Sequence, residues 1–186
     1  MAAAARARPS SVAALVAFGL VAAFALAGCA TDDECPAVAL EAGGADMAGS
    51  GFIAWPGVDA SAQIACGFQG GTHLWVSARF QRPFTAGERM RFGVRSVDAT
   101  TGALTAPGQT ALACRPTKQA DGWWHCDGLF HFIARPCLVA GRALRVQVSM
   151  YPEDGCTAAA TAIVTPVWQG DCTDPEVSWC DPGQGG

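Results

Sequence analysis

From residue 49 to residue 168, short runs of alternating hydrophobic and polar residues are separated by glycine, proline and aspartate turns. Alternation with a period of two is typical of a β-strand with one buried face. The clearest run covers residues 72–81. Its apolar residues share one face: Leu74, Val76, Ala78 and Phe80. Its other face carries His73, Trp75, Ser77 and Arg79.

Two more segments, residues 88–96 and 142–151, repeat this alternation with arginines in the outward phase. Their predicted inward residues are Met90, Phe92, Val94, Leu144, Val146, Val148 and Met150. A last strand is predicted over residues 159–168, and weaker strands over 51–55, 61–68, 109–115 and 122–133. Residues 36–40 could form an edge strand, and residues 82–87 a hairpin-like loop. The pattern predicts an all-β fold, an antiparallel β-sandwich of about eight or nine strands.

The first 28 residues do not show this alternation of hydrophobic and polar positions. Arg6 and Arg8 precede an uninterrupted apolar run over residues 12–27. This run is shorter than the roughly 20 residues that a straight membrane-spanning helix needs. A positive start, a short apolar centre and small residues at its end are typical of an export signal. A retained signal anchor is the alternative.

The apolar run ends in Leu26-Ala27-Gly28-Cys29, which resembles the lipobox of bacterial lipoproteins. In that family the cysteine thiol receives a diacylglyceryl group, and a peptidase then cuts before the cysteine. The resemblance implies a cleaved signal peptide over residues 1–28 and a lipid on Cys29, with the membrane as a partner. Several acyl chains hold a protein stably, whereas one holds it marginally. An ordinary secretory signal with a chance cysteine is the alternative.

The lipobox resemblance also implies a location in the cell envelope. In some envelopes an aspartate after the lipidated cysteine retains the protein in the inner membrane. Ala30 occupies that position here, which favours the outer membrane or the cell surface. We expect an acidic, glycine-bearing tether over residues 29–48, the sandwich over 49–170 and a cysteine-containing tail over 171–186.

Eight cysteines remain when Cys29 is set aside: Cys35, Cys66, Cys114, Cys126, Cys137, Cys156, Cys172 and Cys180. An even number in an exported domain predicts four disulfides. Pairing stays open, with Cys114–Cys126 across a hairpin and Cys172–Cys180 across the tail as two suggestions. No pair has the C-x-x-C spacing of a zinc site, so we expect disulfides and no metal.

The net charge and the absence of catalytic motifs argue against several classes of function. Twelve lysines and arginines less the two in the signal leave ten against sixteen acidic residues, a net of about −6. This balance argues against nucleic acid as a partner. Neither G-x-S-x-G nor H-E-x-x-H occurs. We therefore expect no enzymatic activity and no cofactor, with a small envelope hydrolase lacking a recognisable motif as the alternative class.

One group of residues could form a binding surface: His73, Trp75, Arg79, Arg91, Arg95, Trp123 and Trp124. Aromatic rings beside guanidinium groups can bind a sugar or an acidic glycan by stacking and bidentate hydrogen bonds. The alternative is a packed or solvated sheet face. Neighbouring tryptophans on a strand point to opposite faces, so one of Trp123 and Trp124 should belong to the core.

Residues 67–79 begin Gly67-Phe68-Gln69-Gly70-Gly71-Thr72-His73. This segment resembles a Gly-x-Gln-Gly-Gly-x-His turn-to-strand element in uncharacterised lipoproteins of large-genome predatory or social bacteria. The resemblance implies an immunoglobulin-like sandwich and carries no site residues. We expect a lipid-anchored envelope protein that serves as a non-enzymatic binding or structural module, with an envelope protein or a glycan as its partner. A glycan-binding surface protein is the alternative.

Overall fold

The computed structural model describes Cys35, residues 37–56, 60–67, 71–105 and 109–170, and Cys172. These residues belong to one compact unit, Cys35–Gly186. The predicted signal peptide and Cys29 lie outside the described residues, as do Phe68, Gln69 and Gly70 of the glycine-rich element. Within the described part no helix is both long and apolar enough to cross a membrane.

The described chain is all-β, as the alternation predicts. Its strands are β1 (Ala39–Gly44), β2 (Ile53–Ala54), β3 (Ala60–Cys66), β4 (Thr72–Gln81), β5 (Met90–Asp98), β6 (Thr110–Cys114), β7 (Thr117–Lys118), β8 (Trp124–Phe132), β9 (Leu144–Tyr151) and β10 (Ala158–Val167). The two-residue strands β2 and β7 bring the number to ten. One short helix, α1 (Pro136–Val139), was not predicted.

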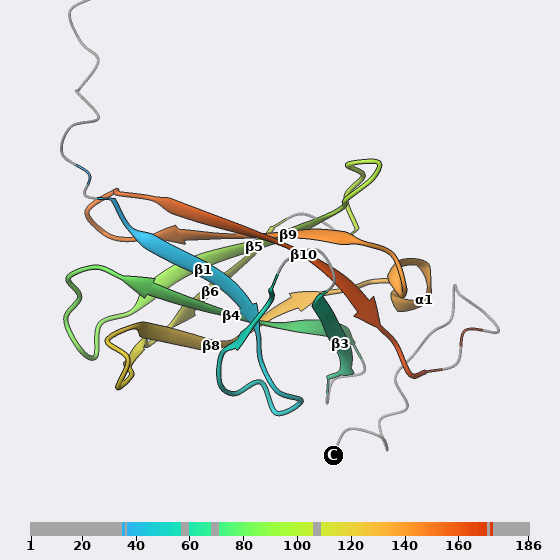
Figure 1. Cartoon of the computed structure of the whole chain (residues 1–186), viewed down its shortest axis with the longest axis horizontal. Helices are drawn as coiled ribbons and strands as arrows, with labels where there is room; N and C mark the ends of the chain where they lie inside the picture. The colour runs from blue at the N-terminus through green and yellow to red at the C-terminus, as the bar shows by residue number, and fades with distance from the viewer. Residues whose placement is uncertain are drawn as a thin grey trace, which may run out of the picture. The chain divides into compact units, whose positions relative to one another are not determined.

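The strands form two layers of a curled, mixed sheet (Figure 1). In one layer β4 pairs with β8 along one edge, while β1 and β3 share its other edge. The second layer runs β10–β9–β5–β6. Residues 164–167 of β10 pair with β3 in parallel, so the sheet departs from the purely antiparallel pairing expected. This arrangement is compatible with an immunoglobulin-like sandwich.

Buried apolar side chains fill the space between the two layers. Leu74, Val76, Ala78 and Phe80 of β4 are 0% exposed. The inward residues of β9, Leu144, Val146, Val148 and Met150, are equally buried. The predicted phase of both strands is confirmed. A slip of one residue would turn Arg79 and Arg145 into this core, and burial of unpaired charges opposes that strongly.

Disulfides connect the two layers and join the sheet to the segments before and after it. Cys114–Cys126 joins β6 to β8, with 6.0 Å between their Cα atoms, and this predicted pair is confirmed. Cys35 bonds to Cys156 and Cys137 bonds to Cys172. The suggested Cys172–Cys180 pair is therefore wrong, because Cys172 reaches back to the residue that follows Pro136. Cys66 is disulfide-bonded as well.

Two connections differ from the expectation. β4 and β5 do not pair: β5 lies between β6 and β9 in the other layer, so residues 82–87 cross between layers instead of closing a hairpin. β1 lies inside the predicted tether, and it pairs with both β2 and β4. Residues 39–44 are therefore part of the sheet.

A bulge in β8 changes which residues face the core. Val76 pairs with Leu129 and Ala78 pairs with Cys126, so β8 has one extra residue at this point. Gly128 lies there with φ +71°, a conformation that suits glycine. Trp124 and Cys126 point inward before the bulge, and Leu129, His131 and Ile133 after it. The core-facing residues of β8 therefore have even numbers before the bulge and odd numbers after it.

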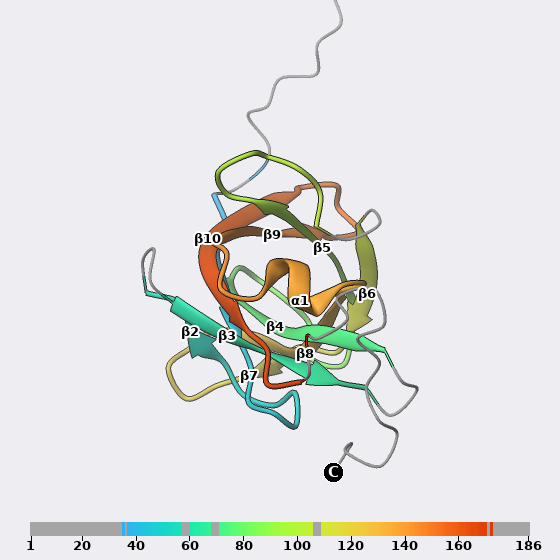
Figure 2. The same cartoon turned by 90° about the vertical axis from the view of Figure 1, so that its right-hand side faces the viewer.

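One end of the layers is covered by α1. Pro136 and Val139 are buried, and Val139 belongs to the core cluster. In Figure 2 this helix lies in front of the opening between the layers. The short helix therefore shields the apolar interior at the end where β9 begins.

We predict that Val146→Ala lowers the free energy of unfolding by about 1–3 kcal/mol, because it removes packed methyl groups from the interior. Arg145→Ala on the exposed face of the same strand is the control and should change stability by less than about 0.5 kcal/mol. Urea unfolding of the two variants with disulfides intact measures both values. Equal losses would contradict the assigned phase of β9.

Candidate functional site

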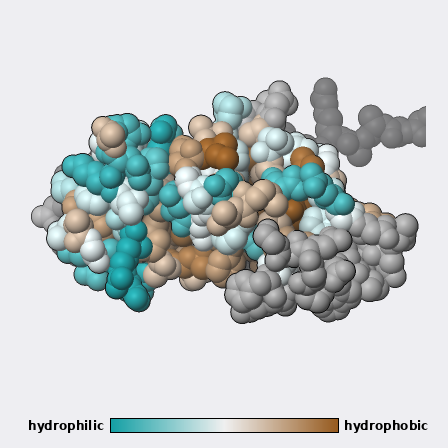
Figure 3. All heavy atoms as spheres, turned by 90° about the horizontal axis from the view of Figure 1, so that it is seen from below, coloured by the Kyte–Doolittle hydropathy of each residue, from teal (hydrophilic) through white to brown (hydrophobic). Residues whose placement is uncertain are grey.

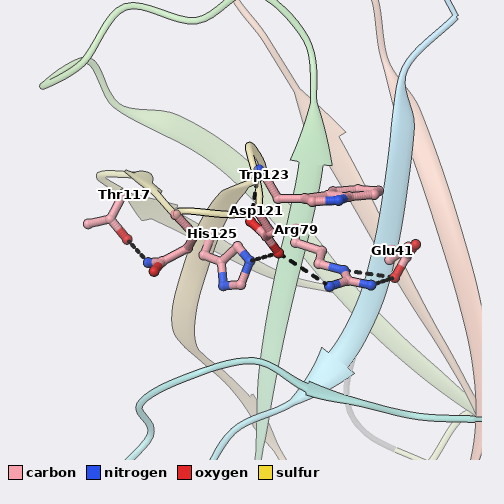
Figure 4. Close-up of polar contacts among 7 residues, drawn as sticks. Glu41, Arg79, Thr117, Asp121, Trp123 and His125 are labelled. Carbon is pink, nitrogen blue, oxygen red and sulfur yellow. Dashed lines mark hydrogen bonds and ion pairs between the residues drawn. The ribbon is translucent and has the colours of Figure 1, made fainter.

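A row of polar side chains crosses the outward face of the β4 layer. Glu41 of β1 pairs in register with Arg79 of β4, and Arg79 with His125 of β8. His125 in turn pairs with Thr117 of β7. Residues that lie directly opposite on neighbouring strands share a face. Four strands therefore bring together side chains that are up to 84 residues apart in the chain (Figure 4).

The guanidinium of Arg79 is held on all sides. Its Nε and Nη2 donate to Oε2 of Glu41 at 2.8 and 2.7 Å. Its Cζ lies 4.6 Å from the centre of the Phe52 ring and 4.7 Å from that of Trp123. Nη1 is 3.8 Å from Oδ2 of Asp121. Cation–π contacts and ion pairs within the protein therefore occupy the Arg79 guanidinium. Few of its hydrogen-bond donors remain for an acidic ligand.

The same cluster is rich in carboxylate oxygen. Oδ2 of Asp121 also lies 4.0 Å from Nε2 of His125. The backbone N–H of Trp123 donates to Oδ1 of Asp121 at 3.0 Å. Glu41 and Asp121 are 45% and 47% exposed. Ion pairs this exposed contribute little to stability. A ligand at this cluster would meet carboxylate oxygens, which accept hydrogen bonds, beside aromatic rings. This differs from the cationic surface predicted for acidic glycans.

A second outward group is aromatic. Trp75 of β4 pairs with Phe130 of β8, and His73 pairs with Phe132. The rings of His73 and Trp75 are 4.4 Å apart, edge to face. Phe130 and Phe132 are 45% and 43% exposed. We call these four residues the aromatic surface. The underside of the domain shows hydrophobic patches in its middle and hydrophilic residues towards the left (Figure 3).

The loop between β1 and β2 partly covers Trp75. Asp46 shapes this loop by accepting hydrogen bonds from the backbone N–H groups of Ala48 and Ser50 at 2.9 and 2.8 Å. A side chain added at Gly49 would lie 3.0 Å from the Trp75 ring. Ser77 Oγ–H donates to Gly51 O at 2.9 Å. Trp75 is therefore half-buried, and Phe130 and Phe132 form the accessible part of the aromatic surface.

The structure divides the predicted binding surface. Arg91 and Arg95 lie on β5 in the other layer, where they are exposed, so they do not join Arg79. Trp124 belongs to the core, 5.2 Å from the Phe84 ring, while Trp123 lies outside beside Arg79. The expectation that one of the two tryptophans is buried is confirmed. The expectation that arginines of both strands share one face is wrong.

A buried polar group was missed by sequence reasoning. Ser96 Oγ lies 2.7 Å from Nε2 of His131 and 2.6 Å from Oγ1 of Thr105. Thr110 Oγ1 lies 3.4 Å from Nδ1 of His131. Burial lowers the pKa of His131 to about 4, so the ring is neutral at pH 7. Asp127-Gly128, the bulge dipeptide, was the only available signal that His131 turns inward.

Ser96 and His131 have the spacing of a serine nucleophile and its base, yet they are sealed. Ser96 is 1% exposed and His131 is 0% exposed. The partner of Nδ1 is a hydroxyl, where hydrolases place a carboxylate. In this position the pair joins β5 to β8 across the interior and cannot meet a substrate.

Two open depressions lie elsewhere on the domain. One, of about 450 Å³, lies between residues 82–90 and 152–154. The other, of about 610 Å³, lies between β1 and β10, near Trp55. No group of three or more metal-ligating side chains gathers within the described ranges. Neither depression contains a histidine or a cysteine among its lining residues.

Comparisons of the chain with protein-family models, with curated proteins and with solved structures found no match.

We predict that stability falls as the pH is lowered from about 6.5 to about 4. The folded pKa of His131 is about 4, below the unfolded value, so the unfolded chain binds the proton first. The contribution of neutral His131 to the free energy of unfolding is fully present above pH 6.5. Up to about 3 kcal/mol of this free energy is lost by pH 4. Urea unfolding at intervals of one pH unit measures the loss.

His131→Gln is the matched variant, because glutamine keeps a polar side chain that does not titrate. Its free energy of unfolding should vary less between pH 6.5 and 4. Burial also lowers the pKa of His73, so His73→Gln should remove a smaller share. Hydrogen bonds lower the pKa of Asp46, Asp98 and Asp154, so the stability that these carboxylates contribute is lost as the pH falls below about 5, mostly below this window. A wild-type slope in His131→Gln would contradict the assignment.

Proposed function

We propose that the protein is a lipid-anchored cell-envelope protein whose disulfide-stapled β domain is a non-enzymatic binding or structural module. The observation that carries the proposal is the set of cysteines. Nine are present, and an odd number cannot all pair within one chain. The one cysteine in a lipobox-like sequence, Cys29, accounts for the odd residue.

The described disulfides agree with this account. Three bonds use six cysteines, and Cys66 is disulfide-bonded too. The cysteines left for Cys66 are Cys29 and Cys180. A lipid on the Cys29 sulfur would exclude it from a disulfide and leave Cys180 as the partner. Disulfides of this number are typical of exported domains, which supports a place in the envelope.

The site geometry supports binding over catalysis. The buried Ser96–His131 pair has no access to solvent, and the outward groups are sheet surfaces of rings and carboxylates. Such surfaces provide stacking and hydrogen bonding without placing a nucleophile beside a base. A role in holding or contacting another envelope component follows from these groups.

Cys29→Ser should release the protein from the membrane fraction or leave an uncleaved precursor, because the acceptor sulfur for the lipid is gone. Metabolic labelling with a palmitate analogue, followed by flotation of membranes, measures both effects. Label that persists in Cys29→Ser would refute the lipid assignment.

Thiol titration supplies an independent control for this variant. Cys29→Ser under denaturing conditions without reductant should show no free thiol, since the eight other cysteines are paired in the proposal. Cys180→Ser should expose one thiol, that of Cys66. Two or more free thiols in Cys29→Ser would overturn the proposed set of four disulfides.

A glycan is the second candidate partner, and the exposed rings of Phe130 and Phe132 favour it. Sugar rings stack on exposed aromatic faces, and ring contacts are worth about 0.5–1.5 kcal/mol each. The His73 ring lies 6.3 Å from the Phe130 ring, edge to face, and Nε2 of His73 and Nε1 of Trp75 are buried without a hydrogen-bond partner in the described part of the chain. The surface is neutral, so the expected ligand is an uncharged sugar.

Phe130→Ala and Phe132→Ala should each weaken retention of glycans by about two- to twelvefold, the loss expected for one stacked ring. An array of envelope glycans probed with the detergent-solubilised protein measures retention. Leu138→Ala is the control, since Leu138 is 42% exposed on α1, outside the aromatic surface. Equal retention by all variants would exclude this surface as the glycan site.

A further inference from the structure

We propose that the end of the domain carrying the Cys35–Cys156 disulfide faces the membrane, where its loops contact zwitterionic phospholipid headgroups. This inference rests on the proposed lipid at Cys29. It adds an orientation to that proposal and identifies the lipid-facing surface.

Only a short stretch of chain connects Cys29 to the sheet. Cys35 is bonded to Cys156 at a Cα–Cα distance of 5.3 Å, and β1 begins four residues later. Only five residues separate Cys29 from Cys35, so even a fully extended connection spans at most about 22 Å. A tether reaching residue 48 would span about 70 Å. The disulfide thus ties one particular end of the domain close to its anchor.

Two loops and Lys118 lie at the same end as the Cys35–Cys156 disulfide. The N–H of Cys156 donates to Asp154 at 3.0 Å, and Arg82 pairs with the same carboxylate. The loop after β4 and the turn after β9 therefore meet beside the disulfide. Leu40, near the start of β1, is in register with Phe80, Trp124 and Lys118. Lys118 consequently belongs to the anchored end.

The opposite end of the domain carries α1 and part of the aromatic surface. α1 precedes β9 and Cys156 follows it, so the eight residues of β9 separate them by about 25 Å. His73 and Phe132 lie seven residues along β4 from Phe80, at about the same distance. With its Cys35 end tethered, the domain holds α1 and the aromatic surface away from the lipid.

The chemistry of the anchored end fits zwitterionic headgroups. The depression there is lined by residues of both charges and by apolar ones, including Arg89, Glu88, Glu153 and Phe84. A phosphodiester can accept hydrogen bonds from arginine, while the cationic part of the headgroup suits the carboxylates. Trp123 lies near this end beside Arg79, and tryptophan favours the membrane interface. A surface of one charge sign would instead have indicated a purely ionic partner.

The chain offers a specific label for the test, because Lys118 is its only lysine. An amine-reactive fluorophore is attached to the purified lipidated protein, which is then reconstituted in phosphatidylcholine vesicles. A fraction of the choline headgroups carries a nitroxide quencher. The matched variant Lys118→Arg/Leu138→Lys moves the single amine to α1 at the other end. Lys118→Arg alone measures any labelling of the terminal amino group.

We expect the label at Lys118 to be quenched several-fold more strongly than the label at position 138. Equal quenching, or stronger quenching at position 138, would overturn the orientation. Flotation of the same vesicles is measured separately. A protein that floats but shows equal quenching contradicts only the orientation, whereas one that does not float contradicts the proposed lipid anchor.

Discussion

The structure depends on the alternation of side chains along β4. Its inward residues, from Leu74 to Phe80, are completely buried against the second layer, and both of its edges are paired. Its outward residues contribute Arg79 to the polar row and Trp75 to the aromatic surface. A shift by one residue would destroy the core and both surfaces together. The same physical constraint therefore determines the stability of the domain and the arrangement of its candidate sites.

Alternation predicted the strands and their phases well, because it reports directly on which face is buried. It carried no information on pairing partners. The crossing of residues 82–87 between layers therefore placed Arg91 and Arg95 on the opposite side from Arg79. A single extra residue had an equally large effect in β8. The bulge at Gly128 exchanges the inward and outward phases, which buries His131 and exposes Phe130. A one-residue irregularity leaves only a weak trace in a hydrophobicity pattern.

The cysteines show the same division between what is local and what is not. The Cys114–Cys126 pair was predictable because both residues flank one hairpin-like segment. Cys137–Cys172 and Cys35–Cys156 join parts that only the sheet topology brings together. The long pair at Cys35 has the larger functional consequence. It ties the start of the domain to the turn between β9 and β10, so Cys35 and β1, which lie within the expected tether, belong to the domain.

The two outward surfaces then have different prospects as binding sites. The Arg79 cluster lies towards the end that carries the Cys35–Cys156 disulfide, and its guanidinium already contacts Glu41 and two aromatic rings. The aromatic surface lies about one strand length away, with two phenylalanines exposed and no ion pair to break among the described residues. Stacking on these rings costs little desolvation of charge, whereas recruiting Arg79 would require an anion to displace a carboxylate. In the proposed orientation, a partner that approaches from outside the membrane would meet Phe130 and Phe132 first.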